Sequence, residues 1–71
     1  MKISYAEHAL QRMKERGVSV TEIEAAFAHG KKDDAKEGRR MIEYMTKKGT
    51  LKVVYRILNI KSIEVISTYW I

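Results

Sequence analysis

The sequence lacks the crosslinks and metal sites that stabilise many small proteins, and it lacks the segments that anchor proteins to membranes. Its 71 residues contain no cysteine, which excludes disulfides and thiolate metal sites. Two histidines alone cannot form a structural zinc site. No apolar run approaches the roughly 18 residues that span a bilayer, and the N-terminal stretch MKISYAEHAL turns polar too early for a signal peptide. We therefore expect a cytoplasmic protein without membrane association.

The sequence also lacks the common cofactor and metal motifs. It has no P-loop, no dinucleotide fingerprint, no His-Glu-x-x-His and no calcium loop. We accordingly expect no cofactor and no metal. The length fits a single domain over residues 1–71. Because so short a chain buries only about 60% of its unfolded surface, its stability must come from a tight core or from a partner subunit.

The charge is positive, with 14 Lys and Arg against 9 Asp and Glu, a net +5. A positive excess on a small domain favours polyanions such as nucleic acid, or an acidic partner protein. The alternative is that the charge serves solubility alone.

Two helices are predicted in the N-terminal half. Ser4 followed by Glu7 forms a capping-box pattern, which predicts a helix beginning near Tyr5 and ending at Gly17. Its apolar stripe at helical spacing consists of Ala6, Ala9, Leu10 and Met13. Ser19 and Glu22 form a second capping-box pattern, which predicts another helix that ends at Gly30. This helix would bury Ile23, Ala26 and Phe27.

The C-terminal half changes to the alternating pattern of strands. A polar stretch over residues 31–38 is a surface loop or at most a short edge strand. Three runs rich in β-branched and aromatic residues then predict strands, at Arg39–Thr46, Thr50–Leu58 and Ser62–Trp70. We expect turns at Lys48-Gly49 and at residues 59–61.

The predicted pairing separates the strand residues onto two faces. With those turns, Ile42 lies opposite Tyr55, and Tyr55 lies opposite Val65. The predicted core face holds Ile42, Tyr44, Leu51, Val53, Tyr55, Ile57, Ile63 and Val65. The other, mixed face holds Met41, Glu43, Met45, Lys52, Val54, Arg56, Glu64, Ile66 and Thr68. The expected fold class is α+β, with two N-terminal helices packed on a three- or four-stranded antiparallel sheet. The mixed face would serve as a binding groove or a homodimer surface.

His8, Arg12 and Arg16 follow each other at intervals of four residues on the first helix. They form a stripe beside the apolar one. A neutral imidazole can act as a general base, and a guanidinium can grip a phosphate with two hydrogen bonds. Together they suit phosphodiester cleavage. The alternative is a boundary histidine with two arginines in helix salt bridges, for example to Glu15.

Further cations are candidates for nucleic-acid contacts. Arg56, on the central strand, would contact a phosphate or stabilise a pentavalent transition state, or else form a cross-strand ion pair with Glu64. Arg39 and Arg40 at the start of the first long strand, and Lys52 on the mixed face, could follow a nucleic-acid backbone or belong to a solvated rim.

The helix motif His8-Ala9-x-x-Arg12-Met13-x-x-Arg16-Gly17 resembles the signature of a family of small prokaryotic domains. Weaker matches follow at Gly38-Arg39-Arg40 and at Val53-Val54-Tyr55-Arg56. This family is grouped with the barnase, EndoU, colicin and RelE ribonuclease folds, and it is similar in outline to BrnT-type toxins. The resemblance implies a RelE-like fold and metal-independent RNA cleavage under the control of an antitoxin.

The function predicted on this basis is a toxin-type RNA endonuclease. His8, Arg12 and Arg56 would be the catalytic residues. RNA would be contacted by Arg16, Arg39, Arg40 and Lys52. Two alternatives stay open, a non-catalytic module that binds nucleic acid and a homodimeric interaction domain. Acid and base roles vary within the group, so a matched position does not by itself assign a role.

Overall fold

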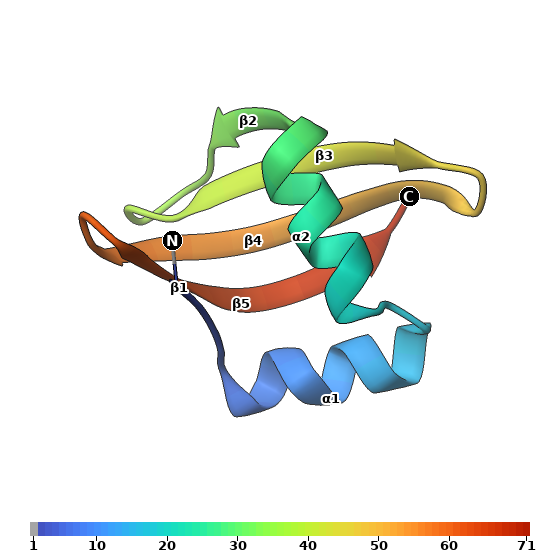
Figure 1. The fold of residues 1–71 in the computed structure, drawn as a ribbon, viewed down its shortest axis with the longest axis horizontal. Helices are drawn as coiled ribbons and strands as arrows, with labels where there is room; N and C mark the ends of the chain where they lie inside the picture. The colour runs from blue at the N-terminus through green and yellow to red at the C-terminus, as the bar shows by residue number, and fades with distance from the viewer. Residues whose placement is uncertain (1) are drawn as a thin grey trace.

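The computed structural model describes residues 2–71, and within them two helices pack against a five-stranded sheet (Figure 1). The elements are β1 (Lys2–Tyr5), α1 (Glu7–Arg16), α2 (Val20–His29), β2 (Lys31–Asp34), β3 (Arg40–Thr46), β4 (Gly49–Asn59) and β5 (Ser62–Trp70). The strand order is β1-β5-β4-β3-β2. The α+β class is confirmed, but the sheet has one strand more than the upper prediction. It is also mixed, because β1 runs parallel to β5.

The additional strand is β1, and it corrects the prediction of a first helix capped by Ser4. The N-cap residue of α1 is Ala6, which makes no side-chain capping bond. Ser4 lies inside β1, between Ile3 and Tyr5, which pack against the core. Fully burying a large apolar side chain is worth about 1.5–3 kcal/mol, and here two large side chains are each partly buried, whereas a capping bond is worth about 1 kcal/mol. The strand therefore outcompetes an earlier helix start.

The other helix boundaries agree with the prediction. Gly17 ends α1 in the left-handed conformation, with φ of 65°. The predicted capping box begins α2, where Glu22 N–H donates to the Ser19 hydroxyl and the Glu22 carboxylate accepts from the Ser19 N–H. Within the polar stretch that follows, residues 31–34 form the short edge strand β2. Neither helix of the described chain has the length and apolar character needed to cross a membrane.

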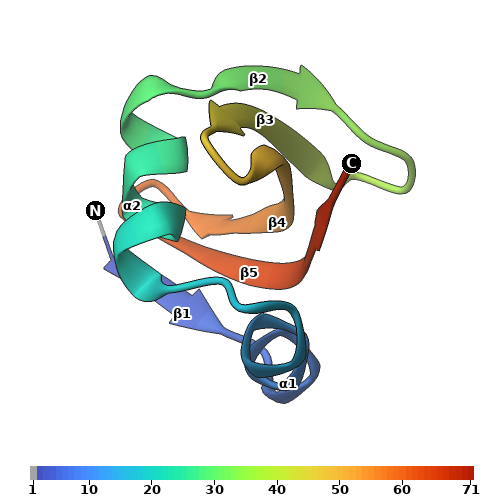
Figure 2. The ribbon, with the colours of Figure 1, turned by 90° about the vertical axis from the view of Figure 1, so that its right-hand side faces the viewer.

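The two helices occupy different places on the sheet. In Figure 1, α2 lies across the face of β3, β4 and β5, while α1 lies along the border of the sheet beside β5. Figure 2 shows α1 next to β5 and β1, on the side of the sheet far from β2. The buried apolar side chains between helices and sheet are Ala9, Met13, Val18, Ile23, Ala26, Phe27, Ile42, Leu51, Val53, Tyr55, Ile63 and Val65. We call the opposite side of the sheet the outer face.

The β3–β4 pairing differs from the prediction by two residues. The turn is at Lys47-Lys48, so that Thr46 lies opposite Gly49 and Ile42 lies opposite Val53. A shift of two residues leaves every side chain on its predicted face, since the side-chain period of a strand is two. The β4–β5 pairing is as predicted at its centre, where Tyr55 lies opposite Val65.

A β-bulge in β5 overturns one facial assignment. The β4–β5 register shifts between Val54 and Tyr55, leaving Ile66 without a partner on β4. Beyond an extra residue the side chains of the bulged strand change faces. Thr68, predicted on the mixed face, is therefore fully buried, and Trp70 packs against the core. Ile57 is a second correction, since it faces the helix side opposite Ile63 yet is 53% exposed.

Candidate functional site

A groove of about 420 Å³ lies at one end of the outer face. It reaches from the start of α1, across β5 and β4, to the loop between β2 and β3. The lining residues are Ala6, Glu37, Gly38, Arg39, Arg56, Ile57, Glu64 and Ile66, and we call this the arginine groove. Two guanidinium groups and two carboxylates thus meet around one hollow.

Arg56 forms the cross-strand ion pair that its register predicts. Its Nε donates to Glu64 Oε1 at 2.7 Å, and the two residues are direct partners in the β4–β5 ladder. The side chains are 56% and 24% exposed, so the pair stands open to solvent. Within residues 2–71 the Nη groups of Arg56 have no hydrogen-bond partner. Because a guanidinium carries five N–H donors in a planar fork, the free edge can still bind an anion.

Arg39 is the second cation of the groove. Arg40, the first residue of β3, pairs with Tyr55 of β4, so Arg39 lies just before β3 and Arg56 lies just after Tyr55 on β4. Arg39 is exposed, and among the described residues it takes part in no ion pair. Arg39 and Arg56 thus offer two guanidinium groups in one groove, and guanidinium groups bind phosphate through strong, charge-assisted hydrogen bonds.

The loop beside Arg39 holds a strained residue that sequence reasoning missed. Glu37 has φ of 63° and precedes Gly38 with φ of 74°. The left-handed conformation costs a non-glycine residue about 1–2 kcal/mol, and such strain clusters at functional sites. The Glu-Gly pair in a polar stretch signals a turn, but nothing in the sequence indicates that this turn borders the groove. Glu64 was foreseen only as a partner of Arg56.

His8 and Arg12 form a separate pair on α1. Arg12 Nε donates to His8 Nε2 at 3.2 Å, and Arg12 Nη1 lies 3.4 Å from Glu15. In the first contact His8 Nε2 is the acceptor. Neither residue lines the arginine groove, although Ala6, at the beginning of the same helix, does. The structure therefore brings the predicted site residues together in two pairs, Arg39 with Arg56 and His8 with Arg12.

The other predicted RNA contacts already have partners within the protein. Arg16 Nη1 donates to the Thr68 carbonyl at 2.6 Å, which ties α1 to β5. Arg40 pairs with Asp34 at 3.4 Å, and Lys52 pairs with Glu43 at 3.2 Å. All three lie outside the arginine groove.

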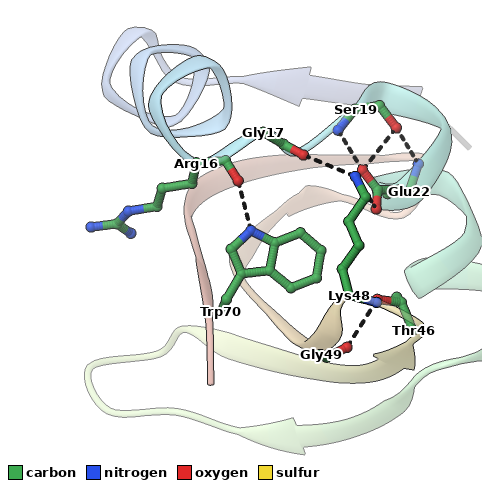
Figure 3. A network of polar contacts seen from close by, with 8 residues as sticks. All are labelled: Arg16, Gly17, Ser19, Glu22, Thr46, Lys48, Gly49 and Trp70. Carbon is green, nitrogen blue, oxygen red and sulfur yellow. Dashed lines mark hydrogen bonds and ion pairs between the residues drawn. The ribbon is translucent and has the colours of Figure 1, made fainter.

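A further polar cluster joins the α1–α2 turn to the β3–β4 turn (Figure 3). Lys48 Nζ lies 3.4 Å from Glu22, 3.4 Å from the Gly17 carbonyl and 5.8 Å from the centre of the Trp70 ring. The Trp70 indole N–H donates to the Arg16 carbonyl at 2.7 Å. We call this cluster the Lys48 clasp. The hydrogen bond from the Ser19 backbone is the main reason why the pKa of Glu22 lies below its ordinary value, and Lys48 adds to the effect.

No group of three or more His, Asp or Glu side chains in residues 2–71 is placed to hold a metal ion. The side chains in and near the groove offer guanidinium and carboxylate groups and, on α1, imidazole. These groups can bind a phosphate, stabilise negative charge and transfer a proton.

Comparison with known proteins adds the fold relationship and the family. No curated protein sequence matches this chain. The crystal structure of the Brucella abortus ribonuclease toxin BrnT is similar, with a TM-score of 0.78 over 100% of this chain and 96% of that chain. The sequence identity is 19%, so this likeness establishes a BrnT-like fold. A family model matches residues 5–70. The chain therefore belongs to the family described as a domain of unknown function, DUF4258.

Proposed function

We propose that the chain is a metal-independent RNA endonuclease of the toxin type, acting in the cytoplasm, and that the arginine groove receives the RNA backbone. The observation that carries the proposal is that Arg39 and Arg56 line the same groove, with guanidinium donors free to bind a phosphate. The fold likeness to a ribonuclease toxin and the net charge of +5 support it.

The reaction would use the RNA's own 2′-hydroxyl as the nucleophile. Its oxygen would attack the adjacent phosphorus while Nε2 of His8 takes its proton. The bond from phosphorus to the 5′-oxygen would break and that oxygen would take a proton from water, which leaves a 2′,3′-cyclic phosphate and a free 5′-hydroxyl. Arg39 and Arg56 would stabilise the negative charge on the pentavalent phosphorus, and Arg12 would hold the phosphate. An incoming hydroxyl would displace Arg12 from Nε2.

The experiment is incubation of the purified chain with cellular RNA in the presence of EDTA. We expect cleavage, and a loss of rate of about 100-fold or more in Arg56→Ala and in His8→Ala. Lys14→Ala is the matched control, because Lys14 is an exposed cation of α1 outside both pairs. Cleavage at the parent rate by folded Arg56→Ala would contradict the role of the groove. The same result with His8→Ala would remove His8 and leave Glu64 as the candidate base.

An antitoxin is the protein partner that this function implies. We propose that a neighbouring reading frame encodes it. Expression of the chain alone should arrest growth, and co-expression of the neighbour should restore it. Growth arrest that no neighbouring frame relieves would argue against this partner.

A non-catalytic nucleic-acid-binding module is the second candidate. Two observations favour it, namely that His8 lies outside the groove and that Glu64 already occupies Nε of Arg56. This reading predicts binding without product and an affinity that falls steeply between low and moderate salt. A homodimer formed through the outer face is compatible with either candidate, and sedimentation at several concentrations tests it.

A further inference from the structure

The end of the sheet that α2 leaves uncovered carries a group of exposed apolar side chains. Ile57 and Leu58 at the end of β4 are 53% and 47% exposed, and Ile60 in the following turn is 97% exposed. In Figure 1 this β4–β5 turn extends well beyond α2. Single exposed apolar residues are ordinary on protein surfaces, whereas a contiguous group marks an interaction site.

Ile57 and Ile60, but not Leu58, border a second hollow, of about 460 Å³. Its lining residues are Phe27, Lys32, Tyr55, Ile57, Asn59, Ile60, Ser62 and Ile63, and we call it the hairpin pocket. At its base Phe27 and Tyr55 meet edge to face, with ring centres 4.8 Å apart. A pocket with a firm aromatic base and an apolar rim suits the insertion of large apolar side chains.

The charged side chains of the hairpin pocket's lining have one sign, while Asp34, near Tyr55, is paired with Arg40. The lining contains one cation, Lys32, and no carboxylate. Lys61 lies between two lining residues, and its carbonyl accepts the Lys2 N–H at 2.7 Å, which brings a third lysine alongside. Among residues 2–71 none of these lysines is in an ion pair. The Lys32 ammonium donates to the Phe27 carbonyl at 3.0 Å, which holds its charge at the rim.

These observations distinguish between the possible occupants. A second copy of the chain, seated pocket to pocket, would bring Lys32 and Lys61 against identical lysines at a cost in repulsion. RNA would meet the charges but no open aromatic face, because Phe27 and Tyr55 are buried. A protein segment with apolar and acidic residues satisfies both the apolar rim and the lysines.

We propose that the hairpin pocket docks an acidic amphipathic segment of another protein. Its apolar side chains would enter beside Ile57 and Ile60, and its carboxylates would meet Lys32 and Lys61. The proposal does not depend on ribonuclease activity, since the hairpin pocket and the arginine groove have only Ile57 in common among their lining residues, and neither arginine of the groove lines the pocket.

Titration of the isotope-labelled chain with two designed peptides tests the proposal by NMR. Both peptides are helical, of about 18 residues, with the same leucine face, and they carry glutamate or lysine on the polar face. We expect the glutamate peptide to shift the resonances of Ile57, Leu58 and Ile60. Ile60→Ser should weaken its binding about tenfold or more, and Lys61→Glu should weaken it severalfold.

Two control variants match those changes at the opposite end of β4. Met45→Ser removes a side chain that is 80% exposed near the β3–β4 turn, and Lys47→Glu reverses an exposed charge in that turn. Both should bind the glutamate peptide like the parent. Ile60→Ser should cleave RNA at the parent rate, which separates this test from that of the proposed function.

Three outcomes would overturn the proposal. They are equal binding of the lysine peptide, resonance shifts confined to the outer face, and no binding of the glutamate peptide at about 1 mM. A concentration-dependent dimer that Ile60→Ser abolishes would also overturn it, because a second copy would then be the occupant.

Discussion

The two ends of β4 are built in opposite ways. Near Gly49 the strand is tied to both helices by the Lys48 clasp, which includes an ion pair, a partly buried indole and two bonds to backbone carbonyls. Near Asn59 the strand runs past α2 and ends in exposed isoleucine and leucine. The difference teaches that this small chain concentrates the long-range hydrogen bonds of its side chains at one end of the sheet. At the other end Ile57, Leu58 and Ile60 are exposed and lie outside the buried core.

Replacement of Trp70 should have the largest effect on stability. We expect Trp70→Ala to lower the free energy of unfolding by about 3 kcal/mol, because it removes a core-packed indole and its bond to the Arg16 carbonyl. Trp70→Phe keeps most of the packing but loses the indole hydrogen bond, so it should lower the free energy of unfolding by about 1 kcal/mol. Urea denaturation followed by circular dichroism measures both. A loss below about 0.5 kcal/mol in Trp70→Ala would show that the clasp does not hold this end.

Removal of the α2 cap should have an intermediate effect. Ser19→Ala deletes the hydroxyl that accepts the Glu22 N–H, and we expect a loss of about 1 kcal/mol. Thr21→Ala, at an exposed position of the same helix turn, is the control and should be neutral or slightly stabilising. Thermal unfolding of the two variants side by side is the measurement. Equal melting temperatures would contradict the role of the cap.

The same clasp should make stability depend on pH in the acidic range. Since the pKa of Glu22 is lower in the folded chain than in the unfolded chain, its contribution is complete above about pH 4.3 and disappears as the pH falls through the folded pKa. The parent should therefore be more stable than Glu22→Gln at pH 7, and the difference should shrink towards pH 3. A difference that stays constant between these pH values would contradict the assignment.

Substitution at the open end should have the smallest effect. Ile60→Ser removes a side chain that is 97% exposed, so its free energy of unfolding should stay within about 0.5 kcal/mol of the parent. Urea denaturation under the conditions used for Trp70→Ala gives the comparison directly. A loss above about 1 kcal/mol would mean that Ile60 packs within the fold and that the two ends are not different in kind.

Much of the fold could be predicted because local patterns agree with tertiary packing. The capping box at Ser19, the stop at Gly17 and the three long strands all follow from neighbouring residues. Ser4 and Glu7 gave a wrong prediction of where α1 begins, because a capping-box pattern also fits a strand that precedes a helix. The additional strand depends on β5, far away in the chain, and no local pattern reports such a partner.

The bulge at Ile66 and the exposure of Ile57 escaped prediction for related reasons. A bulge inserts one residue into an otherwise regular alternation, so the sequence continues to look like an unbroken strand. Ile57 has the spacing of a core residue, but its burial depends on where α2 ends in space. Sequence patterns predict the direction of a side chain better than they predict what covers it.

The site was only partly predictable. The register placed Arg56 beside Glu64, and helical spacing placed Arg12 beside His8, and the structure has both contacts. The joining of Arg39, Glu37 and Arg56 around one groove depends on how the β2–β3 loop bends over the sheet. The catalytic and RNA-binding roles of these residues stay predictions until the variants are measured.

The parallel pairing of β1 with β5 also bears on how the chain folds. It joins Ile3 to Ile63, and α1 packs on β5 as well. Contacts between residues so distant in sequence require closure of a long loop, which slows folding relative to a helical bundle of the same size. A chain leaves the ribosome from its N-terminal end. During synthesis β1 and α1 therefore emerge before β5, and β1 can pair in the sheet only after β5 has been made.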